Sequence, residues 1–215
     1  AFTGVSAGST PASYATTFYD CGYAQGAAMV DTFSAKGGTV VFNYVNNLAY
    51  NDSFHIDEII NFLDQQKGEH TKILCNFDEK PASLFYKKLD GHEHADKISL
   101  YVSPRMLTKN ALDAGGYKFD INGYTSWLPQ IDTPENQAFK NALKKEPDTF
   151  HLSGWQAGLV LNKILAMPED VQNSGEQIVK QLEGITLQSP SSSMRLDTAT
   201  NFFTADVIYK CTLQA

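Results

Sequence analysis

The chain has 215 residues, of which 42% are hydrophobic and 19% are charged, and its formal net charge is −7. This composition is typical of a folded globular protein, and no segment approaches the roughly 18 to 20 consecutive apolar residues that a membrane span needs. Lysines and arginines are scattered, which argues against a nucleic-acid partner. The 3 cysteines are too far apart in sequence for a zinc-ligand pair, and their odd number leaves at least one outside any intramolecular disulfide.

The first half of the chain alternates between predicted strands and predicted helices. The strands are rich in β-branched and aromatic residues, whereas the helices show apolar residues at helical spacing and begin or end at capping residues. In chain order the elements are a strand at 15–20, a helix at 24–36, a strand at 39–45, a helix at 53–67, a strand at 71–76, a helix at 79–90, a strand at 97–102 and a helix at 103–114. Repeated strand–helix units predict a flavodoxin-like α/β fold, a parallel sheet with helices on both faces.

The alternation stops after a fifth strand predicted at 119–124. Residues 125–132 are predicted to be extended, and helices then follow without an intervening strand, at 133–145, 150–167 and 174–183. A Ser- and Pro-rich stretch leads to a last pair of strands near 194–196 and 202–211. We therefore expect the chain to leave the first sheet near Tyr124, to cover other structure, and to return near Asn201.

Five short segments carry a family resemblance through their order and spacing. They are Asp20 to Gly26, Gly38 to Phe42, Asp52 to Phe54, Ile131 to Asn136 with Phe139, and Met194 to Asp197 with Asn201. In this order they resemble the type I periplasmic solute-binding proteins, which include the leucine/isoleucine/valine-binding and amide-binding proteins. The resemblance implies one lobe of a two-lobed protein at 14–125 and 197–212. It also implies that 126–196 form a hinge crossover and a helical segment that would pack on an N-terminal lobe missing from this sequence.

The resemblance also implies a function. It indicates a non-enzymatic, periplasmic or cell-surface component of an ABC transporter that needs no cofactor or metal. Such a protein closes its lobes around a small polar solute, such as an amino acid or amide, and passes it to a membrane permease without inserting into the membrane itself. A ligand-binding sensor domain of a receptor is a further alternative with the same fold.

Ligands of open parallel sheets bind beyond the carboxyl ends of the strands. On this basis the candidate ligand-binding residues are Tyr23, Phe77, Asp78, Ser103, Arg105 and Tyr124. By resemblance Tyr23 matches the family's ligand-contacting tyrosine, and Phe77 and Asp78 stand where the family often places an aromatic and polar pair. Ser103 and Arg105 stand where amino-acid binders carry an acidic residue, which leaves room for an acidic or neutral polar ligand.

Each of these residues also has a structural interpretation. Tyr23 could cap its strand end, and Asp78 could favour the N-terminus of the following helix rather than accept from an ammonium group. Arg105 could be a solvated helix residue. Tyr124, like Trp127, could line a cleft or simply pack the crossover.

Two further motifs offer different chemistry. Ser6 lies in a Gly-x-Ser-x-Gly motif, the pattern of an esterase nucleophile, and His151 is the late histidine that such a hydrolase would need. No long strand precedes Ser6, so a terminal segment is the favoured interpretation. His92 and His94 could hold a metal through two imidazoles, but their predicted loop favours a solvated polar turn.

Overall fold

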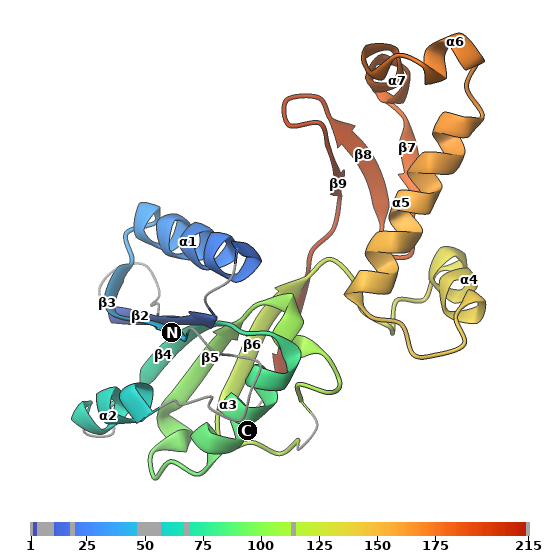
Figure 1. The fold of residues 1–215 in the computed structure, drawn as a ribbon. Helices are drawn as coiled ribbons and strands as arrows, with labels where there is room; N and C mark the ends of the chain where they lie inside the picture. Colours follow the sequence, from blue (N-terminus) through green and yellow to red (C-terminus); the bar gives the residue numbers. More distant parts are fainter. Residues whose placement is uncertain are drawn as a thin grey trace. The chain divides into compact units, whose positions relative to one another are not determined.

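The computed structural model describes residues 2–3, 11–17, 20–46, 57–66, 69–112 and 115–213 (Figure 1). The chain divides into two compact units. Unit 1 comprises Ala1–Tyr124 and Lys210–Ala215, and unit 2 comprises Thr125–Tyr209.

Unit 1 is built around a 7-stranded sheet with the order β10-β6-β5-β4-β1-β2-β3, in which β2 also pairs with β4. Its strands are β1 (Phe2–Thr3), β2 (Pro11–Thr17), β3 (Thr39–Asn46), β4 (Thr71–Asn76), β5 (Ile98–Val102), β6 (Asp120–Thr125) and β10 (Tyr209–Leu213). The pairs β2–β3, β2–β4, β4–β5 and β5–β6 are parallel, whereas the short β1 is antiparallel to its neighbours. The order β3-β2-β4-β5-β6 is that of a flavodoxin-like sheet, which confirms the predicted fold class.

The helices of unit 1 lie on both faces of this sheet. They are α1 (Asp20–Ala35), α2 (Asp57–Gln65) and α3 (Glu79–Asp90), with 3-10 turns η1 (Ala95–Lys97) and η2 (Pro104–Leu107). Figure 1 shows α1 on one face and α2 and α3 on the other. This follows from right-handed crossovers, because α1 leads to a strand on one side of β2 whereas α2 and α3 lead toward the opposite edge.

Helix α1 ends at Ala35, one residue before the predicted end at 36, and two glycines follow soon after it. Gly37 has a φ of 85°, and its amide donates to the carbonyl of Ser34 (2.9 Å) while that of Gly38 donates to Phe33 (3.0 Å). These two bonds satisfy carbonyls that the helix end would otherwise leave open.

The core of unit 1 ties α3 to the strands and to η2. The rings of Phe77, Phe85, Tyr86 and Phe119 are almost completely buried, and the Tyr86 hydroxyl donates to the Met106 carbonyl at 3.0 Å. This bond satisfies the one polar atom of the Tyr86 side chain inside an apolar core.

The helix predicted at 103–114 is wrong, because within the described residues 103–112 the only helical element is the 3-10 turn η2. Thr108 ends this turn with an extended backbone (φ −72°, ψ 155°). Its hydroxyl donates to Glu79 Oε1 (2.9 Å) and accepts from the amide of Ala111 (3.2 Å). A threonine that bonds nearby backbone in this way competes with helix formation.

Unit 2 combines helices with a small antiparallel sheet of order β7-β8-β9. Its elements are α4 (Pro134–Ala142), α5 (Thr149–Leu165), α6 (Glu169–Gln172), α7 (Gly175–Leu182), β7 (Thr186–Gln188), β8 (Ser193–Asp197) and β9 (Phe202–Ala205). Its core contains Trp127, Phe139 and Leu152. The helices α4, α5 and α7 were predicted, but the short α6 and β7 were not.

The return to unit 1 differs from the predicted boundary at 197. Strand β9 pairs with β8, and β8 pairs with β7, so residues 197–209 group with unit 2. The chain rejoins unit 1 at Lys210, where β10 adds to the sheet beside β6.

Candidate functional site

The candidate site lies at the carboxyl edge of the parallel sheet in unit 1. The order of the sheet changes direction between β2 and β4, and such a switch point is where open α/β sheets leave a crevice for a ligand. The segments that leave this edge are the start of α1, the pair Phe77–Asp78 before α3, and Ser103 with η2 after β5.

Two predicted site residues, Asp78 and Arg105, form an ion pair at this edge. Arg105 Nη1 donates to Asp78 Oδ1 at 2.5 Å, and the two side chains are 24% and 20% exposed, respectively. Asp78 occupies the N-cap position of α3 but makes no side-chain capping bond. The ion pair links the end of β4 to η2, while Asp78 keeps its place at the N-terminus of α3.

Ser103 lies two residues before Arg105 and is 6% exposed. Its amide donates to the carbonyl of Cys75 at 3.0 Å, which joins the ends of β5 and β4. Within the described residues its buried hydroxyl has no hydrogen-bond partner. A buried polar group left in this state costs roughly 1–3 kcal/mol, which a polar group that reached the hydroxyl would offset.

The aromatic candidates have different environments. Phe77 has 0% exposure and its ring lies 5.1 Å from that of Phe85, so it packs in the core rather than facing solvent. Tyr124, by contrast, is 58% exposed at the end of β6. Tyr23 belongs to α1, but the position of its side chain lies outside the described part of the structure. Trp127 packs in the core of unit 2, where its indole nitrogen donates to Asn136 Oδ1 at 2.8 Å.

Sequence reasoning missed the contact between Glu79 and Thr108, which also joins the first turn of α3 to the segment after η2. The two residues are far apart in sequence and belong to no motif. Only the parallel pairing of β4 with β5 brings their segments together.

The described residues contain no assembled site for the two alternatives, a serine hydrolase and a metal-binding histidine pair. Ser6 lies outside them, and His151 forms a capping box with Asp148 at the start of α5. Although burial opposes it, hydrogen bonds from His151 and Phe150 hold the pKa of Asp148 below its usual value. His92 is paired with Asp64 at 2.9 Å, and the described chain contains no group of three or more residues placed to hold a metal.

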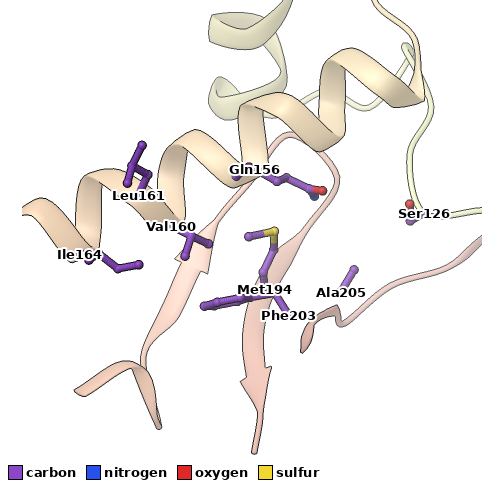
Figure 2. Close-up of a pocket in the computed structure, with 9 residues that line it drawn as sticks. Ser126, Gln156, Val160, Leu161, Ile164, Met194, Phe203 and Ala205 are labelled. Carbon is purple, nitrogen blue, oxygen red and sulfur yellow. The ribbon is translucent and has the colours of Figure 1, made fainter. Parts of the chain in front are cut away.

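Unit 2 contains a groove with a volume of about 520 Å³. Its lining residues come from α5, β8 and β9 and the start of the unit: Ser126, Gln156, Ala157, Val160, Leu161, Ile164, Met194, Phe203 and Ala205. Figure 2 shows Gln156 and Val160 projecting from α5 toward the strand that carries Met194. The groove is mostly apolar and contains none of the predicted site residues.

At one end of this region Gln156 anchors a serine-rich loop. Its amide nitrogen donates to Ser189 Oγ (3.1 Å) and to Ser191 Oγ (3.0 Å), and the carbonyl of Ser191 accepts from the Tyr209 hydroxyl (3.1 Å). The Gln156 amide thus uses both of its hydrogens, and the loop is held at the last residue of unit 2.

Residues 4–209 match a family model described as periplasmic binding protein. No curated protein matches the chain. None of the helices in the described ranges is long and apolar enough to cross a membrane.

Several solved structures share the fold. An ABC transporter solute-binding protein from R. palustris in complex with benzoate is 20% identical, with a TM-score of 0.70 over 92% of this chain and 54% of its own. An ABC transporter substrate-binding protein from Sphaerobacter thermophilus is 20% identical, with a TM-score of 0.75 over 94% and 55%. A branched-chain amino acid transporter substrate-binding protein from Streptococcus pneumoniae in complex with isoleucine is 16% identical, with a TM-score of 0.65 over 94% and 56%. The chain thus spans about half the length of these structures.

Proposed function

Because this chain belongs to the periplasmic binding protein family, we propose that it forms part of the extracytoplasmic solute-binding component of an ABC transporter. The observation that carries the proposal is the family match over 4–209, which includes the flavodoxin-like sheet and the polar residues at its carboxyl edge. The protein would be periplasmic or on the cell surface and would deliver its solute to a membrane permease.

The ligand in this proposal is a small polar solute such as an amino acid or amide, or an aromatic acid. Among the solved structures of the same fold, the R. palustris protein is in complex with benzoate and the Streptococcus pneumoniae protein with isoleucine. Ser103 and Arg105 would contact it from the ends of β5 and η2, and Tyr124 from the end of β6. Tyr23 would contribute from α1. Phe77 is buried, so it would act through the core that fixes Asp78 rather than by touching the ligand.

The two units would have different roles in the binding protein. Unit 1 would be one lobe of a two-lobed binding protein, and the helical segment within 126–196 would pack on a further lobe. Two features support this arrangement. The chain spans about half of its solved relatives, and α5 leaves Leu161 and Leu165 53% and 60% exposed, which is unusual for such an apolar helix.

The test is a thermal-shift screen of the full gene product with amino acids, amides, dicarboxylates and benzoates. A solute that binds only the folded protein must raise its melting temperature, by an amount that grows with the ligand concentration. We expect at least one member to stabilise the protein and to do so by a different amount in the Arg105→Gln variant. A screen in which no member shifts the melting temperature contradicts the proposal.

A further inference from the structure

We infer that the ligand presents an uncharged polar group to the carboxyl edge of unit 1, because Asp78 and Arg105 cancel each other's charge there. This inference rests on the proposed function, since it assigns the chemistry of one end of the ligand at the same site. It excludes a carboxylate and an ammonium group alike at that end.

The close contact between Asp78 and Arg105 weakens the electric field that each charge would have alone. Arg105 Nη1 lies 2.5 Å from Asp78 Oδ1, and each side chain is about three-quarters or more buried. A paired cation and anion act as a dipole, whose field falls off faster with distance than that of a single charge. A ligand carboxylate that approached Arg105 would also meet the Asp78 carboxylate, and an ammonium that approached Asp78 would also meet the guanidinium.

Asp78 pairs with Arg105 in preference to capping its own helix with its side chain. An aspartate at a helix N-cap ordinarily accepts hydrogen bonds from the first backbone amides of the helix. Asp78 is at the N-cap of α3 and makes no such bond, while its carboxylate accepts from Arg105. Asp78 is therefore a positioning residue, which orients and neutralises the guanidinium at the start of η2.

Ser103 supplies the neutral chemistry that an uncharged group would use. Its buried hydroxyl, with no partner among the described residues, has one hydrogen to donate and two lone pairs to accept. An amide, a hydroxyl or a phenol on the ligand matches this capacity without leaving a charge uncompensated. Glu79, at the same edge, accepts a hydrogen bond from Thr108. Its charge is the same in the wild type and in the variants of Asp78 and Arg105, so it does not affect their comparison.

The experiment measures the affinity of the full gene product by calorimetry in two series whose members differ in charge at one end. One series is glutamine, glutamate and ornithine; the other is 4-hydroxybenzoate, terephthalate and 4-(aminomethyl)benzoate. In the wild type, the neutral member should bind most tightly in whichever series binds. Asp78→Asn should shift the affinity ratio about tenfold toward the carboxylate member, and Arg105→Gln should shift it similarly toward the ammonium member.

The controls separate charge at the site from net charge and from folding. Asp206→Asn removes a carboxylate paired with Arg195 at 3.6 Å in unit 2, so it changes the net charge equally and should leave the ratios unchanged. Asp78→Asn removes one partner of a largely buried ion pair, so circular dichroism must first show that the variant is folded at the temperature of the calorimetry. Asp78→Glu retains the charge and should restore the wild-type order.

The outcomes distinguish this inference from the proposed function. If a charged member binds most tightly to the wild type, or if the ratios do not move in Asp78→Asn and Arg105→Gln, the inference is overturned while the binding function stands. If no member of either series binds, both are overturned. A reversal of preference with opposite sign in the two variants supports both.

Discussion

Gly123 in β6 lies directly against Leu107 of η2. A Cβ atom on Gly123 would stand 2.8 Å from Leu107 Cδ1 and 3.1 Å from the carbonyl oxygen of Val102. The missing side chain lets the strand approach the short turn that also carries Arg105, so the packing of β6 and the position of the candidate site are linked.

The variant Gly123→Ala should be less stable than the wild type. The added methyl group meets a backbone carbonyl that cannot move freely, and overpacking of this kind costs roughly 1–3 kcal/mol. Urea unfolding followed by circular dichroism measures the change. Gly158→Ala is the matched control, because a Cβ there meets nothing within 4 Å. In the middle of α5 it should gain about 0.5–1 kcal/mol, and a loss of equal size in both variants would contradict the packing argument.

Replacement of Gln156 by leucine should also destabilise the protein. The change removes two hydrogen bonds to Ser189 and Ser191, which are only 4% and 2% exposed. Loss of a partner from buried polar groups costs about 1–3 kcal/mol, which a chemical denaturation curve detects. Ser153→Ala, on an exposed position of the same helix, should be close to neutral. Equal stabilities of Gln156→Leu and the wild type would show that the loop does not depend on this amide.

The Asp148 cap of α5 should give a pH-dependent contribution to stability. The folded-state pKa of Asp148 is lowered, so its contribution is present above the ordinary value of 3.8 and is lost as the pH falls through the lower folded-state pKa. Asp148→Ala should cost about 1 kcal/mol at neutral pH, and this difference from the wild type should shrink in acid. Asp148→Asn keeps a capping oxygen without a titrating group. Its own difference from the wild type should therefore be small at neutral pH, and a large loss there would contradict the capping assignment.

The two described free cysteines should differ in reactivity. Cys75 is completely buried, and burial raises the pKa of its thiol far above the ordinary value, whereas Cys211 is only partly buried. Because the thiolate is the reactive species, iodoacetamide at pH 8 should label Cys211 well before Cys75 in the native protein. Peptide mapping by mass spectrometry measures the order. In urea the two rates should converge, and early labelling of Cys75 without denaturant would contradict the core position of β4.

The sequence allowed accurate prediction where local signals agreed with each other. The strand at 71–76 and the helix at 79–90 have the bounds of β4 (Thr71–Asn76) and α3 (Glu79–Asp90), since β-branched residues, Pro81 in the first turn and an apolar stripe all indicated the same structure. The helix predicted at 103–114 failed because Thr108 is extended and its hydroxyl accepts from the amide of Ala111 and donates to Glu79. The bond to Glu79 joins residues 29 positions apart, so a local window of sequence does not signal it.

The candidate site was predictable only as a set of positions. The rule that ligands bind beyond strand ends selects Asp78 and Arg105 separately, but the ion pair joins residues 27 positions apart. It forms because β4 and β5 are parallel neighbours, with Cys75 opposite Val102 at their ends. The burial of Phe77 was equally hidden, since an aromatic residue after a strand can face the core or the solvent.

The last strand of the unit 1 sheet comes from the far end of the chain, and this has a consequence for synthesis. Unit 2 is one continuous segment, Thr125–Tyr209, which follows β6 in the chain. Strand β6 pairs with β5 on one side and with β10 (Tyr209–Leu213) on the other, and β10 follows the rest of unit 2 in the chain. Until β10 is made, the outer edge of β6 has unpaired backbone groups, and such an edge is prone to pair with another chain. During synthesis the outer edge of β6 therefore stays unpaired until the whole of unit 2 has been translated.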